Sequence, residues 1–156
     1  MRITIAAVGR MKAGPLQALG DDYAKRLARG PFGRPVVKEV EQRGRLSADE
    51  LTEREASLLE AALPPRARVI ALDERGESLT SRDLAALLAG LRDGGVAELA
   101  FVIGGADGLA ERLRKRAERR IAFGTLTWPH LLVRVMLLEQ LYRAQAILSG
   151  HPYHRD

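Results

Sequence analysis

Short apolar runs alternate with amphipathic stretches along the whole chain, and this alternation predicts the order of its elements. Five runs indicate strands: RITIAAV (2–8), PVVKEVE (35–41), ARVIALD (67–73), ELAFVIGG (98–105) and RIAFG (120–124). The stretches between and after them predict helices over 15–28, 47–63, 81–93, 108–119 and 129–148. Strands that alternate with helices are typical of βαβ units, so we expect an α/β fold in which helices cover both faces of a mostly parallel sheet.

Local signals support several of these boundaries. Ser47, followed three residues later by Glu50, predicts a capping box at the start of the second helix, and Pro129 opens the last helix. The 156 residues suit one domain with a core of its own, and no internal repeat, low-complexity segment or long linker divides them. We therefore expect a single domain over residues 1–156.

Composition narrows the class of protein. Apolar residues make up 46% of the chain, which favours a globular fold, and the absence of cysteine excludes disulfides and thiolate zinc sites. The N-terminal apolar run is too short for a signal peptide, and Arg134, Glu139 and Arg143 interrupt the most apolar late stretch. These features predict a cytoplasmic protein with no membrane span.

The net charge of +5 is compatible with a polyanionic partner. Of the 25 basic residues all but Lys12, Lys25, Lys38 and Lys115 are arginine, and arginine suits RNA because it binds phosphate bidentately and stacks on bases. A GC-rich genome produces the same bias. A cluster at residues 112–120 could contact RNA phosphates, or it could be a solvated helix face that Glu111 and Glu118 partly balance.

Three predicted strands end in unusual residues, and in open α/β sheets ligands bind at the carboxyl ends of the strands. The third strand stops at Leu72-Asp73, the fourth breaks into Gly104, Gly105 and Gly108, and the fifth runs through Gly124 into TLTWPH (125–130). Glycines there allow the backbone to approach a ligand closely, although they also occur in ordinary turns. The G-x-G-x-x-G fingerprint and the P-loop are both absent, which disfavours an oxidoreductase site for a nicotinamide and an ATP site.

The stretch GTLTWPH (124–130) is the most informative of the three. Backbone groups freed in such a loop can hydrogen-bond an adenine edge, while Leu126 and Trp128 pack on its faces. Alternatively, the loop caps the last helix, with Thr127 as the N-cap before Pro129. Both interpretations can hold together.

The motifs LDERG, VIGGADG, TLTWPHLLVRVMLLEQLYRA and GHPYHRD, in this order in so short a chain, resemble the RlmH family. The resemblance is firm from Ala67 to the C-terminus and looser over residues 10–60. These are small SPOUT-class enzymes that use S-adenosylmethionine to methylate N3 of a pseudouridine in helix 69 of 23S ribosomal RNA. The resemblance implies a C-terminal trefoil knot, a homodimer with the knot helices packed together, and the ribosome as partner.

The resemblance also implies which residues hold the cofactor. These are Leu72, Gly104, Gly105, Gly124, Thr125, Leu126, Thr127, Trp128 and Pro129. They fall on the three strand ends already selected on physical grounds. Trp128 departs from the smaller apolar residue that is often found there, so it either tightens the adenine pocket or packs at the dimer contact.

Methyl transfer to N3 requires the ring to be oriented and its proton to be lost, and five residues are catalytic candidates. Arg143 and Arg155 could hold phosphate or the uracil oxygens, His154 and His130 could act as a base, and Tyr153 could stack on the target base. Each has a structural alternative: His130 can cap the last helix, Arg143 can pair with Glu139, and tail histidines are often solvated. No carboxylate or cysteine completes a metal site with the histidines, so we expect no metal.

The C-terminal tail SGHPYHRD (149–156) holds two of the three histidines. We expect it to fold over an active site, that of the partner subunit, when RNA is bound. Two rival functions remain: a knotted methyltransferase that acts on another RNA such as tRNA, and a non-enzymatic basic protein associated with the ribosome.

Overall fold

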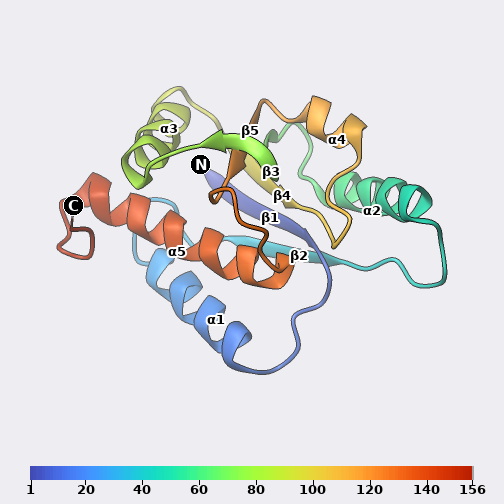
Figure 1. The fold of residues 1–156 in the computed structure, drawn as a ribbon. Helices are drawn as coiled ribbons and strands as arrows, with labels where there is room; N and C mark the ends of the chain where they lie inside the picture. Colours follow the sequence, from blue (N-terminus) through green and yellow to red (C-terminus); the bar gives the residue numbers. More distant parts are fainter. Residues whose placement is uncertain (156) are drawn as a thin grey trace.

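The computed structural model describes residues 1–155 and has the predicted α/β architecture (Figure 1). Five strands form one sheet in the order β2-β1-β4-β3-β5, and every neighbouring pair is parallel. The strands are β1 (Arg2–Val8), β2 (Val36–Val40), β3 (Arg68–Ser78), β4 (Glu98–Ile103) and β5 (Arg119–Ala122). The helices are α1 (Pro15–Leu27), α2 (Ala48–Ala62), α3 (Ser81–Asp93), α4 (Glu111–Arg116) and α5 (His130–Ser149).

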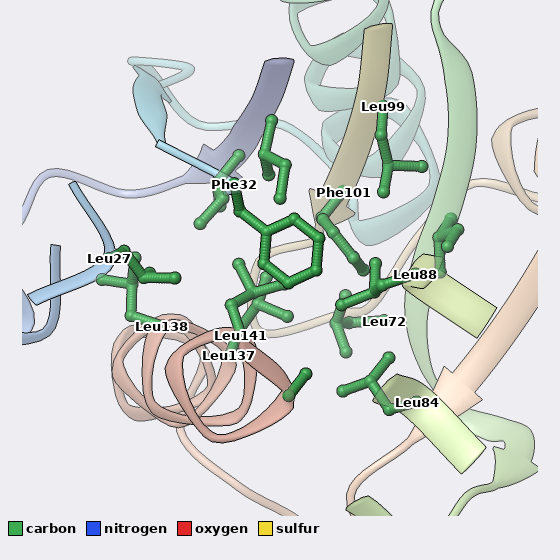
Figure 2. Packing of buried hydrophobic residues seen from close by; sticks show 14 of the residues in the cluster. Leu27, Phe32, Leu72, Leu84, Leu88, Leu99, Phe101, Leu137, Leu138 and Leu141 are labelled. Atoms are coloured by element: carbon green, nitrogen blue, oxygen red, sulfur yellow. The ribbon is translucent and has the colours of Figure 1, made fainter. Parts of the chain in front are cut away.

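The helices divide between the two faces of the sheet because alternate strand residues point to opposite sides. On one face, Ile3 and Ile5 of β1 share a core with residues of α1, α3 and α5. In Figure 2, Phe32 and Phe101 lie among leucines of these three helices. On the other face, Ala6 and Val8 pack with α2 and α4. The predicted coverage of both faces is confirmed.

Local sequence explains where the helices start. Ser47 accepts a hydrogen bond from the Glu50 backbone N–H, and the Glu50 side chain accepts one from the Ser47 N–H, so the predicted capping box is confirmed. Thr80 and Asp83 form a second capping box at α3. The helix α5 begins after Pro129, which is its N-cap, so the alternative in which Thr127 caps this helix is wrong. Proline provides no side-chain oxygen for a cap, and none is present.

Two predicted elements differ in length from the structure. The strand β3 does not stop at Asp73 but continues to Ser78, with a break in register between Leu72 and Glu77. Ile121 of β5 pairs with both of these residues, so the segment between them bulges out of the sheet. The helix α4 has six residues rather than the twelve expected, because Gly108 forms an isolated antiparallel bridge with Gly105 and Ala117 is already extended. Both differences shape the loops at the carboxyl edge of the sheet.

Candidate active site

A pocket lies at the carboxyl ends of β3, β4 and β5, where the sequence predicted a ligand. It encloses about 290 Å³, close to the lower limit for small-molecule sites. Seven of the nine predicted cofactor positions line it: Leu72, Gly104, Gly105, Gly124, Leu126, Thr127 and Trp128. Thr125 and Pro129 belong to the same loop but do not line the pocket. The three strand ends therefore meet in one place, as predicted.

The turn after β4 contains three glycines, and side chains at two of them would clash with neighbouring atoms. A Cβ atom on Gly104 would lie 2.4 Å from the carbonyl oxygen of Gly108, and one on Gly105 would lie 2.9 Å from a carboxylate oxygen of Glu55. Gly108 adopts a φ of +81°, and its N–H donates to the Gly105 carbonyl over 3.2 Å. The turn therefore needs glycine both for space and for conformation, and its backbone comes close to whatever occupies the pocket.

The loop between β5 and α5 forms the opposite wall. Gly124 has a φ of +91°, which lets the chain turn out of β5. The indole N–H of Trp128 donates to the carbonyl oxygen of Phe123 over 3.0 Å and so fixes the ring against the pocket. The contact places Trp128 in the wall of the pocket. Leu126 is 69% exposed and is available to cover a bound group.

His130 is the one catalytic candidate that lines this pocket. It is the first residue of α5, and a Cβ atom on Gly9 would lie 2.8 Å from its Nε2 atom. Burial, together with the nearby positive charge of Arg134, lowers the pKa of His130 below its ordinary value. The imidazole is therefore neutral at neutral pH and can accept a proton or a hydrogen bond.

The other four catalytic candidates lie at the far end of α5. Tyr153 donates to the Glu139 carboxylate over 3.0 Å, and its hydroxyl lies 3.1 Å from that of Tyr23. Its ring packs edge-on against Tyr142 at 4.7 Å. Burial, with the two hydroxyl contacts, raises the pKa of Tyr153 far above its usual value, so the phenol stays protonated. The tail is thus held against its own chain.

Arg143 and His154 complete this cluster at the end of α5. Arg143 pairs with Glu139 through an Nη2–Oε1 contact of 2.5 Å, so the predicted i,i+4 ion pair is confirmed. Its Nη1 lies 3.4 Å from Nδ1 of His154, and its guanidinium lies 4.9 Å from the centre of the Tyr153 ring. Arg155 is exposed. Thirteen helical residues separate Arg143 from His130, which corresponds to about 20 Å along the helix axis. The tail of the chain therefore does not reach the pocket of the same chain.

Five charged residues line the pocket, and none of them was selected as a cofactor or catalytic residue: Asp73, Glu74, Arg75, Asp107 and Arg114. Asp73 and Asp107 line it, and the Arg114 Nε atom lies 3.0 Å from the Asp73 carboxylate. Asp73 also accepts the backbone N–H of Arg75 over 2.8 Å, which holds the bulge of β3 in shape. The sequence analysis named Asp73 only as the end of the third strand, and Asp107 does not stand out because acidic residues are common in loops.

Glu55 was also missed, and it lies behind the pocket on α2. It is 8% exposed, beside Ala56 and Leu59 on the buried side of the helix. Its carboxylate accepts the N–H of Gly105. Burial raises the pKa of Glu55, the negative charge of Asp107 raises it further, and the Gly105 N–H opposes both. A glutamate at a core position of an amphipathic helix was the sequence signal that could have identified it.

A larger groove of about 550 Å³ lies elsewhere, along α5 and the start of α3. Its lining is mainly apolar and includes Leu19, Leu132 and Met136. The groove shares Gly124 and the end of β5 with the strand-end pocket. Neither the glycine turn after β4 nor His130 lines it. We assign the small-molecule site to the strand-end pocket, because backbone and polar groups there can contact a ligand closely. The groove is lined mainly by apolar side chains and is better suited to packing against another protein surface.

Neither a metal site nor a membrane span emerges from the part of the chain that the structure describes. Within residues 1–155 no three His, Asp or Glu side chains converge on a point that could hold a metal ion. The three histidines are divided between the two ends of α5. None of the described helices is both long and apolar enough to cross a bilayer.

Comparison with known proteins agrees with this geometry. The family described as "Predicted SPOUT methyltransferase" matches residues 1–154. "Ribosomal RNA large subunit methyltransferase H" of Rhodospirillum centenum is 55% identical over 156 residues, with 99% of each chain covered. The protein of the same name from Paramagnetospirillum magneticum is 52% identical, also with 99% of each chain covered. The crystal structure of a probable methyltransferase from Bordetella pertussis has a similar fold, with a TM-score of 0.53 at 17% identity over 92% of this chain and 95% of that one.

Proposed function

Because this chain belongs to the SPOUT methyltransferase family, we propose that it methylates large-subunit ribosomal RNA, at N3 of a pseudouridine in helix 69. The observation that carries the proposal is the convergence of three glycine-bearing strand ends on one pocket. Full-length similarity to proteins named as large-subunit ribosomal RNA methyltransferases supports the class of substrate. The assignment of N3 and of helix 69 rests on the sequence motifs, and the fold neighbours support the expected knot.

The lining of the pocket combines backbone groups, glycines and apolar side chains, and this combination suits S-adenosylmethionine. In this proposal, backbone groups of the loop 124–129 bind the adenine edge, and Leu126 and Trp128 cover its faces. Gly104 and Gly105 let the β4 turn approach the rest of the molecule. When bound, S-adenosylmethionine supplies a methyl group on a positively charged sulfur. Leu72 is buried and supplies an apolar part of the pocket wall.

The chain must also deal with the proton on N3. His130 is neutral at neutral pH and lines the pocket, so it can accept this proton directly or through water. Tyr153 stays protonated, and it therefore serves as a stacking or hydrogen-bonding group rather than as a base. Arg143 and Arg155 are cationic and suit the uracil oxygens or a phosphate.

The tail reaches a pocket only if a second subunit provides it. We place His154, Tyr153, Arg155 and Arg143 beside the pocket of the partner in a homodimer. The helix α5 supports this arrangement because apolar side chains occur all around it: Leu137 and Leu141 are buried, while Leu132 and Met136 line the open groove. A second copy that covers the groove would bury these side chains and bring its tail across.

Mapping of ribosomal RNA by mass spectrometry tests the function. A strain that lacks the gene should lose one methyl group on the helix 69 pseudouridine, and the purified protein with S-adenosylmethionine should restore it on isolated ribosomes. Modification of tRNA instead would favour the first rival function. Absence of S-adenosylmethionine binding at millimolar concentration in calorimetry would favour the non-enzymatic rival.

Mixed dimers test the role of the tail. Removal of residues 150–156 should leave folding and dimerisation intact but abolish methyl transfer. If the tail acts in trans, mixing these subunits with a Gly104→Ala variant restores activity, because one of the two composite sites then has both an intact pocket and an intact tail. Full activity of the truncated protein alone would reject the role of the tail.

A further inference from the structure

The basic side chains differ in whether a carboxylate neutralises them. Over α4 and β5, five cations of the cluster that the sequence offered for RNA binding are ion-paired: Arg112, Arg114, Lys115, Arg116 and Arg119. Arg112, for example, contacts both Glu53 and Glu60 of α2. Much of the charge of this cluster is compensated within the protein, which favours its interpretation as a solvated and internally paired surface.

Two loops at the carboxyl edge of the sheet have the opposite character. The loop after β1 (9–14) and the loop after β2 (41–47) carry Arg10, Lys12, Arg43 and Arg45, which we call the basic rim. One carboxylate, Glu41, lies 3.9 Å from Arg10 and 3.3 Å from Arg43. All four cations are exposed. Lys12 and Arg45 have no carboxylate within ion-pair distance anywhere in residues 1–155.

The neighbouring acidic residues leave this positive charge in excess. Glu39 pairs with the buried Arg134 at 2.5 Å and also accepts the Met11 N–H over 2.8 Å, so its charge is already matched. Asp49 and Glu50 open α2 beside the second loop, and the hydrogen bonds from Ser47 keep Glu50 ionised. The four cations of the rim still outnumber the three carboxylates Glu41, Asp49 and Glu50, and the remaining positive charge favours an external anion.

The protein core fixes the rim in place. Val8 and Val40 are paired in the sheet, and the Gly9 N–H donates to the Val40 carbonyl over 2.9 Å, so the two loops leave the sheet side by side. Arg134 of α5 binds the carbonyl oxygens of Val8 and Gly9 over 3.1 and 2.8 Å. A surface held in this way loses little conformational entropy when it binds a partner.

The rim adjoins the pocket through His130. A Cβ atom on Gly9 would touch the His130 imidazole, and His130 lines the pocket. The pocket lining carries Asp73 and Glu74 paired with Arg114 and Arg75, and Asp107, which has no ion-pair partner among the described residues, adds a negative charge that repels phosphate. A nucleotide whose base enters the pocket therefore finds no unpaired cation in the pocket lining for its phosphates, whereas the rim offers exposed cations on the same edge of the sheet.

We propose that the basic rim binds phosphate groups of the RNA strand that flanks the target nucleotide. This inference rests on the proposed function, because it takes RNA as the substrate. Lysine and arginine on loops commonly fix the register of a nucleic acid through its phosphates without reading its sequence. The rim then supplies affinity and orientation, while the pocket selects the base.

The test compares two double variants of the full chain that remove equal charge. Lys12→Gln with Arg45→Gln removes the two unpaired cations of the rim. Arg54→Gln with Arg66→Asn removes two exposed cations that also lack carboxylate partners but lie outside these loops; asparagine is chosen because Arg66 has a φ of +61°. Filter binding to ribosomes from a strain that lacks the gene, measured over a range of KCl concentrations, gives the salt dependence for each variant.

We expect the rim variant to lower the slope of log K against log salt by about 2, because each phosphate that a cation neutralises adds about 1 to this slope. Its KM for ribosomes should rise about tenfold, while the affinity for S-adenosylmethionine and the kcat stay within about twofold. An unchanged slope, or an equal change in the control variant, would overturn the proposal. If the wild-type protein binds ribosomes but does not methylate them, the proposed function fails, and the slopes still decide whether the rim contacts RNA.

Discussion

Glu55 offers a sharp test of how the pocket is built. The carboxylate is buried, accepts the Gly105 N–H, and forms no ion pair with any cation in residues 1–155. Its folded-state pKa is raised, so folding favours the protonated acid. The stability from this group is therefore complete at pH values below the ordinary pKa of glutamate and is lost as the pH rises through the folded value. A difference of one between the folded and unfolded pKa corresponds to about 1.4 kcal/mol in the free energy of unfolding.

Two substitutions separate the charge of Glu55 from its hydrogen bond. Glu55→Gln keeps an oxygen for the Gly105 N–H and removes the buried charge, so its free energy of unfolding should rise relative to that of the wild type as the pH increases above the ordinary pKa of glutamate. Glu55→Ala leaves the Gly105 N–H without an acceptor, which should cost about 1–3 kcal/mol at every pH. The same loss lets the glycine turn move, so we expect the affinity for S-adenosylhomocysteine to fall about tenfold in the alanine variant, with a smaller change in the glutamine variant.

Urea denaturation at several pH values and calorimetry with S-adenosylhomocysteine are the assays. A difference in stability between wild type and Glu55→Gln that does not vary with pH would refute the raised pKa. An alanine variant that binds the ligand as tightly as the wild type would show that Glu55 does not position the turn. Glu53→Gln is a matched control, since Glu53 lies on the exposed side of the same helix and pairs with Arg112 at 2.7 Å.

Three further changes test other parts of the structure. Gly104→Ala should abolish cofactor binding in calorimetry while the circular dichroism spectrum stays native, because its Cβ would lie 2.4 Å from the Gly108 carbonyl oxygen; retained binding would refute this role of the glycine turn. Arg134→Met should lower the free energy of unfolding by about 3–5 kcal/mol in urea titrations, since it leaves the buried carbonyl of Val8, the half-buried carbonyl of Gly9 and the Glu39 carboxylate without their donor, and a decrease below about 1 kcal/mol would contradict this account. Tyr153→Phe removes the hydroxyl contacts with Glu139 and Tyr23 and should cost about 0.5–1.5 kcal/mol; an unchanged melting temperature would show that the tail is not held by them.

The sequence by itself determined the element order and the chemistry of the strand ends. The alternation of apolar runs with helical periodicity predicted the five parallel strands and the helices on both faces, because burial on a pleated sheet or on one side of a helix imposes a period that is visible in one dimension. Glycines at the ends of β4 and β5 marked the pocket for a similar reason, since a positive φ or a close backbone approach leaves few other residue types possible.

Tertiary structure decided which of these residues meet. The bulge of β3 depends on pairing with β5, forty residues or more along the chain, and no local pattern encodes that register. His130 lines the pocket while Tyr153 and His154 do not, because His130 is the first residue of the long helix α5 and the two tail residues lie beyond its last residue. The charge of the cluster on α4 is compensated by Glu53 and Glu60, whereas Lys12 and Arg45 stay uncompensated. Electrostatic partners are chosen by distance in space, and a sequence contains charges without specifying which of them will be neighbours.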